Sequence, residues 1–164
     1  MRKINGVTVI DIVWEGPIPF DHVTKAQDGH DYGVYQVYGT HTVFGPDSLL
    51  YIGLAEQQRF GTRVPIHIKW TEWQSSPTNV YLGRLAGKEP IDESRHEEWS
   101  EMISRAEDLL IYYCSPPYNS HQIQTIPTHP PTVLLNYRHH HRLPAVISNM
   151  GDLSSPNELK PFYE

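Results

Sequence analysis

The sequence predicts an α/β domain built on a small, mainly antiparallel central sheet of three strands, flanked by helices and extended by further strands. Three observations indicate this fold class. The 164 residues suit one domain with a real core, several short runs are rich in β-branched and aromatic residues, and one segment carries a long helical pattern. We expect the domain to span residues 1–150 and residues 151–164 to form a C-terminal tail.

The three central strands are expected at Gly33–Tyr38, Leu49–Gly53 and Asn79–Leu85, because each run is rich in residues that favour strands. The first two should form an antiparallel hairpin with a long exposed connection, since two glycines and a proline lie between them. Flanking strands are predicted at Val7–Trp14, Val133–Leu135 and Ala145–Ser148.

Two helices are predicted. The first should begin near Thr62, a suitable N-cap, and run to about Glu72, with Pro65 tolerated in its first turn. The second should cover Ser94–Tyr113 and end before Pro116. Its apolar residues recur every three or four positions, as expected of one buried face: Trp99, Met102, Ile103, Ala106, Leu109, Leu110 and Tyr113.

Composition limits the possible functions. The net charge of -6 at first opposes nucleic-acid binding. However, eight acidic and two basic residues lie between Glu89 and Asp108, which leaves 11 of each sign among the 19 acidic and 13 basic residues of the chain. No apolar run approaches the roughly 20 residues of a membrane span. The single cysteine, Cys114, excludes an internal disulfide and favours a reducing compartment, which we expect to be the cytoplasm.

Six residues in a fixed order carry the functional prediction. Tyr35 ends Gly33-Val34-Tyr35 and Tyr51 begins Tyr51-Ile52-Gly53, so the two tyrosines lie on adjacent strands and can converge on one face. Taken alone, such tyrosines are more often half-buried strand residues. Arg63 and His67 are four residues apart and share a helix face, where an arginine fork suits a phosphate.

Glu107 lies at the border of the apolar stripe on the long helix, where its carboxylate can point into a cleft. It is otherwise one of eight acidic residues in its neighbourhood, and a solvated helix face is the ordinary reading. Asn119 follows twelve residues later, after Pro116-Pro117-Tyr118.

Together these motifs resemble the active site of the GIY-YIG nuclease family over roughly Gly33–Asn119, and the Arg-x-x-x-His spacing is similar to that of its small restriction-enzyme branch. The resemblance implies a DNA endonuclease that leaves 5′-phosphate and 3′-hydroxyl ends. It also implies Mg²⁺, replaceable by Mn²⁺, with Glu107 as its only protein ligand.

By the same resemblance, Tyr35 would activate or orient the attacking water, while Tyr51 and His67 would hold the phosphate. Arg63 would stabilise the transition state, with Arg59 as the rival for this role. Asn119 would fix the active-site loop or the hydration of the metal.

Further DNA contacts are expected from basic residues outside these motifs, namely Arg59, Lys69, Arg138, His140 and Arg142. The three consecutive histidines between Arg138 and Arg142 share no single face and have no cysteine pair beside them, so phosphate contact is favoured over a zinc site. Sequence recognition would come from loops such as Gly39–Ser48 and from the chain after Thr125. Double-strand cleavage would need a homodimer or two sequential nicks. Two alternatives stay open: a non-catalytic DNA-binding module on the same fold, and a nuclease that is structure-specific or indifferent to sequence.

Overall fold

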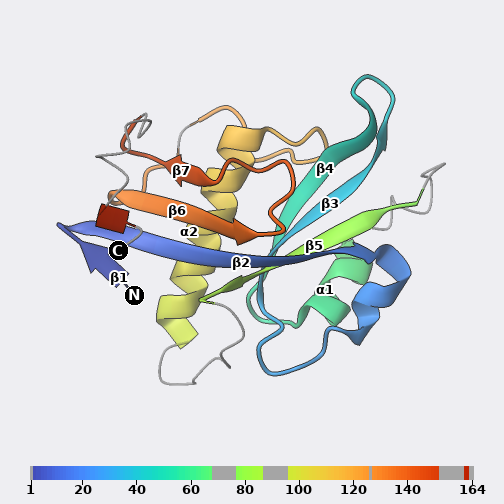
Figure 1. Ribbon diagram of the computed structural model, residues 1–164, viewed down its shortest axis with the longest axis horizontal. Coiled ribbons are helices and arrows are strands. Elements are labelled where there is room, and N and C mark those ends of the chain that lie inside the picture. The colour runs from blue at the N-terminus through green and yellow to red at the C-terminus, as the bar shows by residue number, and fades with distance from the viewer. Residues whose placement is uncertain (1, 68–76, 87–95, 126, 152–160, 163–164) are drawn as a thin grey trace.

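The computed structural model describes residues 2–67, 77–86, 96–125, 127–151 and 161–162, except for the side chain of His67. These residues form one seven-stranded sheet, two α-helices and a short 3-10 helix (Figure 1). The strands are β1 (Arg2–Ile4), β2 (Val7–Pro19), β3 (Gly33–His41), β4 (Gly45–Ala55), β5 (Asn79–Leu85), β6 (Thr132–Arg138) and β7 (Val146–Ser148). The helices are η1 (Phe20–Lys25), α1 (Phe60–His67) and α2 (His96–Cys114).

The predicted fold class is wrong. The protein has a curled, mixed sheet of seven strands with few helices, rather than a small three-stranded sheet flanked by helices. The order is β4-β3-β5-β2-β6-β7, and β1 pairs with β2. The physical reason is β2, which is 13 residues long and hydrogen-bonds to β1 and β5 along one edge and to β6 along the other. The strands expected to flank the sheet are therefore continuous with it.

The individual elements agree better with the sequence. The antiparallel β3–β4 hairpin is confirmed, as are a third strand at Asn79–Leu85 and a long helix, which runs from His96 to Cys114 among the described residues. The shorter helix is confirmed from Phe60 to His67, and its expected continuation to Glu72 lies outside the described residues. No helix in the described part of the chain combines the length and the apolar character that crossing a membrane requires.

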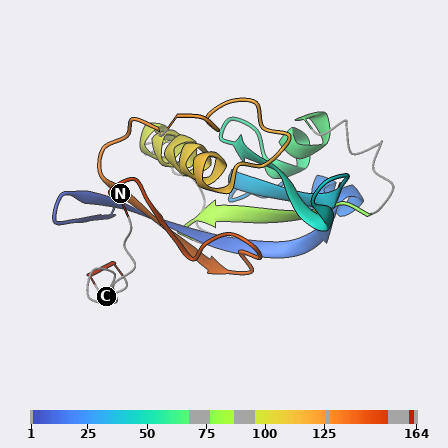
Figure 2. The same ribbon diagram turned by 90° about the horizontal axis from the view of Figure 1, so that it is seen from above.

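The core is divided by the sheet. Val34 and Tyr38 of β3 pack in the cluster that contains the apolar face of α2. Tyr35 of β3 packs instead with Phe60 and Val64 of α1. This follows from the alternation of side chains along a strand. Figure 2 shows α2 lying along one side of the sheet. The two helices thus approach the sheet from different faces, and both contact β4.

A third cluster lies at the other end of the sheet. Val9 of β2 and Val133 and Leu135 of β6 pack there against Phe162, which is 7% exposed. Phe162 belongs to the segment expected as a tail, so this part of the tail contributes apolar contacts to the folded protein.

Candidate active site at the outer edge of β4

The site is organised by backbone groups of β4 that do not pair with β3. In an antiparallel pair, alternate residues of an edge strand direct their N–H and C=O groups outward. On β4 these residues are Leu50, Ile52 and Leu54. The Leu50 C=O accepts a hydrogen bond from the Tyr118 N–H at 3.0 Å. The other two residues bind the side chains that the sequence motifs single out.

Asn119 binds both backbone groups of Ile52. Its Oδ1 accepts from the Ile52 N–H at 3.0 Å, and its Nδ2 donates to the Ile52 C=O at 2.8 Å. The residue is 9% exposed. Of the two roles expected for Asn119, these contacts support fixing the loop after α2 against β4.

Leu54 joins the two charged residues. The Leu54 N–H donates to the Glu107 carboxylate from α2, and the Leu54 C=O accepts from the Arg63 Nε of α1 at 3.3 Å. The two backbone groups of Leu54 therefore hold a carboxylate and a guanidinium that come from helices on different faces of the sheet. Arg63 and Glu107 are 44 positions apart in the sequence.

The side chains of Tyr35 and Tyr51 meet beside Gly53, the residue before Leu54. Their ring centroids lie 6.1 Å apart, and a hydrogen bond joins the two phenols. Gly53 makes this approach possible, because a Cβ at position 53 would lie 2.5 Å from the Tyr35 Oη and 2.7 Å from the ring of Tyr51. The close approach of the two tyrosines thus explains why glycine, and no larger residue, stands at position 53.

Burial sets the protonation of the tyrosines. Tyr35 is 1% exposed, and burial, followed by the neighbouring Tyr51, raises its pKa far above 10. Burial also raises the pKa of Tyr51, with a further contribution from Glu107. Both phenols are therefore neutral at neutral pH and act as hydrogen-bond donors in this state of the protein.

Glu107 is held close to its titration point at neutral pH. Burial first, and then the neighbouring Asp108, raise the pKa of Glu107 from 4.5 to about 7. Arg63 and the Leu54 N–H act in the opposite direction, and Glu56 adds a smaller repulsion. The carboxyl group consequently gains or loses a proton easily near pH 7, or exchanges it for a cation.

The rival arginine lies elsewhere. Arg59 has an exposed side chain, and its backbone C=O accepts from the N–H groups of Thr62 and Arg63 at the start of α1. Arg63, by contrast, acts electrostatically on Tyr35, Tyr51 and Glu107. His67 is the last residue of α1, four positions after Arg63. Lys69 lies outside the described residues.

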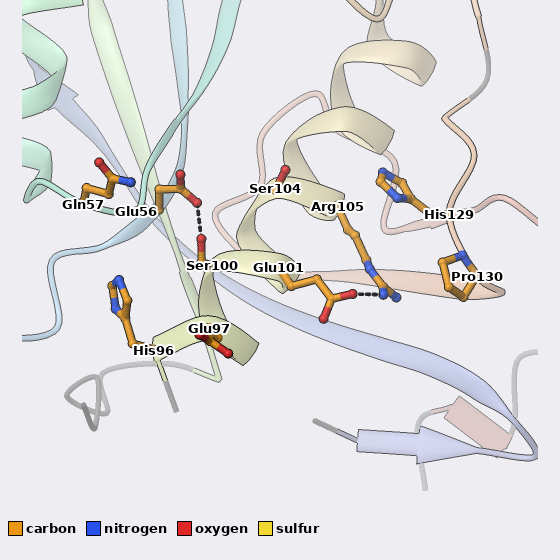
Figure 3. A pocket seen from close by; sticks show the side chains of 10 residues that line it. All are labelled: Glu56, Gln57, His96, Glu97, Ser100, Glu101, Ser104, Arg105, His129 and Pro130. Atoms are coloured by element: carbon orange, nitrogen blue, oxygen red, sulfur yellow. Dashed lines mark hydrogen bonds and ion pairs between the residues drawn. The ribbon is translucent and has the colours of Figure 1, made fainter. Parts of the chain in front are cut away.

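A groove of about 810 Å³ lies between the end of β4 and α2 (Figure 3). Glu56 lines it and accepts a hydrogen bond from the Ser100 hydroxyl at 2.5 Å. Because Glu56 also raises the pKa of Glu107, the groove adjoins the site. His129 lines the opposite side and binds Asp108 at 2.8 Å. Sequence reasoning missed Glu56, whose only signal is its position just after the strand that carries Tyr51.

The structure does not bring the expected DNA-binding residues of the C-terminal part to the outer edge of β4 around Leu54. Arg138 lines a separate cavity of about 660 Å³ beside Arg84. The His140 Nδ1 bonds the Leu143 C=O at 2.8 Å and so closes a turn. The Arg142 guanidinium donates to Asp47 at 3.0 Å, next to the β3–β4 connection.

A second group of possible metal ligands also escaped the sequence reasoning. Asp28, His30 and Asp31 place their ligand atoms within 4.8 Å of one another, and their close spacing in the sequence was the available signal. Asp31 is 3% exposed, however, and Arg84 donates to it at 2.5 and 3.1 Å. Because this carboxylate is already neutralised, the group is a weaker candidate than Glu107.

No family model, no curated protein and no solved structure matches this chain.

Proposed function

We propose that the chain is a metal-dependent DNA endonuclease of the restriction type, which hydrolyses a phosphodiester bond to 5′-phosphate and 3′-hydroxyl ends. The observation that supports this most is the meeting of Tyr51, Arg63 and Glu107 around the outer edge of β4, with Tyr35 behind Tyr51. An arginine fork, a carboxylate and phenolic donors in one place suit a phosphodiester and a divalent cation.

The residues fit Mg²⁺ or Mn²⁺. Mg²⁺ prefers oxygen ligands, and it is commonly held by one or two carboxylates together with phosphate oxygens and water. Glu107 offers such a carboxylate, and its pKa of about 7 allows a cation to replace the proton. A bound cation would supply Lewis-acid stabilisation of the charge that develops on the phosphate.

The chain's own residues would bind and orient the substrate. The Arg63 Nε is held by the Leu54 C=O, so the outer part of the guanidinium fork would meet a phosphate oxygen. Tyr51 is the more exposed of the two tyrosines and would donate a hydrogen bond to the phosphate or to the attacking water. The deeply buried Tyr35 would orient Tyr51, and Asn119 would keep the outer edge of β4 in place.

The test is cleavage of supercoiled plasmid DNA at low salt, with and without Mg²⁺. We expect the native chain to cut only with the metal, and Glu107→Gln to lose at least 100-fold in rate. Glu97→Gln is the matched control, because it removes an exposed carboxylate from the same helix. Equal cutting by the native chain and Glu107→Gln would refute the proposal.

Other outcomes distinguish the alternatives. Native protein that shifts DNA in a gel but never cuts it with Mg²⁺ or Mn²⁺ would identify a non-catalytic DNA-binding module. Discrete fragments would indicate sequence recognition, whereas a smear would indicate a nuclease without it. We place the action in the cytoplasm, where Cys114 would stay reduced, and double-strand cleavage would need a homodimer or two nicks.

A further inference from the structure

The tip of the β3–β4 hairpin carries two adjacent apolar side chains in solvent. Val43 is 78% exposed and Phe44 is 66% exposed, the two highest values among the exposed large hydrophobic residues of the described chain. Figure 1 shows the hairpin projecting beyond the rest of the sheet. Adjacent apolar side chains that stay in solvent give the tip an apolar surface that could contact a partner.

The tip is ordered by its own contacts. The His41 Nδ1 accepts hydrogen bonds from the N–H groups of Val43 and Phe44, at 3.2 and 3.3 Å. The imidazole ring of His41 also stacks on the Phe44 ring, with centroids 4.7 Å apart, and the centroid of the Tyr118 ring lies 5.8 Å from that of His41. Phe44 is thus held in one orientation, which lowers the entropy cost of using it in a contact.

The tip is continuous with the proposed active site. Tyr118, which contacts His41, donates its N–H to Leu50 on the same outer edge of β4 that carries Leu54. Phe44 precedes Leu54 by ten residues, a distance of about 30 Å along an extended strand. DNA that follows this edge would reach the tip roughly nine base pairs from the cut, at 3.4 Å for each pair.

The hairpin also carries little charge. Between Gly33 and Ala55, Asp47 is the only Asp, Glu, Lys or Arg, in a protein with a net charge of -6. Asp47 is itself paired with His141 and Arg142, both at 3.0 Å. The tip can therefore approach a phosphate backbone without repulsion from unpaired carboxylates.

We infer that Phe44, with Val43 beside it, inserts as an apolar wedge between base pairs of the DNA that lies along β4. Proteins that insert apolar side chains between base steps unstack them and kink the duplex. The inference rests on the proposed function for its DNA target. It adds a distortion of the duplex at a distance from the cut.

The test measures unwinding of nicked plasmid that DNA ligase seals in the presence of protein. All proteins carry Glu107→Gln to prevent cutting. We expect this variant to shift the topoisomer distribution, and addition of Phe44→Ala to remove most of the shift and to weaken binding on the order of 5-fold or more. Met150→Ala is the control, since it truncates another exposed apolar residue of the described chain, 38% exposed, and it should leave the shift unchanged.

The outcomes separate this inference from the proposed function. The wedge is overturned if Glu107→Gln binds DNA without a topoisomer shift, or if the variant that also carries Phe44→Ala gives an equal shift. Either result leaves the nuclease proposal standing. Failure of every variant to bind DNA at low salt overturns both. A dimer that Phe44→Ala dissociates in sedimentation, without any topoisomer shift, would show that a second copy of the chain covers the tip and would also overturn the wedge.

Discussion

Neutralising the proposed metal ligand should stabilise the ligand-free protein. Glu107→Gln keeps the shape of the side chain and an oxygen that can accept from the Leu54 N–H, but it removes the titrating group. The pKa of Glu107 in the folded protein is about 7, against an ordinary value of 4.5. Between these values the folded state binds more protons than the unfolded state. The free energy of unfolding therefore falls as the pH rises through this window.

The size of the effect follows from the same two values. At 1.36 kcal/mol for each pH unit between 4.5 and about 7, the ionised carboxylate costs roughly 3 kcal/mol above pH 7. We therefore expect Glu107→Gln to unfold with a free energy about 3 kcal/mol higher than the native chain at pH 8.5. The melting temperature should rise by roughly 6–12 °C. At pH 5 the difference should shrink below about 1 kcal/mol, because the native carboxyl group is then mostly protonated.

Urea unfolding of both proteins at pH 5 and pH 8.5, without divalent metal, measures this difference. Glu97→Gln serves as the control, because its side chain is exposed and its substitution should change stability by under about 1 kcal/mol at either pH. A destabilised Glu107→Gln at pH 8.5, or a difference that does not change with pH, would refute the reasoning.

Three further substitutions test the remaining contacts. Gly53→Ala places a Cβ about 2.5 Å from the Tyr35 Oη, so we expect a loss of roughly 1–3 kcal/mol by urea unfolding and at least 10-fold slower plasmid cleavage. Asn119→Ala leaves two backbone groups of β4 without their partner and should cost about 1–3 kcal/mol in the same unfolding measurement. Asp47→Asn releases Arg142, and asparagine tolerates the positive φ of 53° at this position. The affinity for DNA should therefore increase, and the slope of log affinity against log salt concentration should steepen by about 1. Unchanged values for any of the three variants would contradict the corresponding contact.

Local sequence patterns predicted most elements because each has a local cause. The periodic apolar residues around Ile103 and Leu110 required a helix, and the glycines around the β3–β4 connection required a turn. The sheet could not be predicted in the same way. Its continuity depends on the parallel pairing of β2 with β6, where Thr8 lies opposite Thr132, and on the 2.8 Å bond from the Trp14 indole to Asn136. A strand sequence alone does not show which partner it will have.

The residues of the candidate site could be chosen from the sequence only where a motif needs a particular residue type. The order of the motifs selected Glu107 from the eight acidic residues between Glu89 and Asp108, and its contact with Leu54 supplies a geometric reason for that choice. Glu56 and His129 carry no motif, because the folded chain alone brings them to the groove. His140 was assigned to DNA by its charge, yet its ring closes a turn, and sequence spacing cannot reveal such a contact.

Mapping the bound cation by Mn²⁺-induced broadening of backbone amide signals tests the central claim most directly. If the active site lies at the outer edge of β4, broadening should centre on residues 53–55 and on the α2 turn around Glu107, and Glu107→Gln should abolish it. It should also strengthen between pH 6 and pH 8, as the Glu107 carboxyl group loses its proton. Broadening centred on Asp28, His30 and Asp31, and unaffected by Glu107→Gln, would contradict the account.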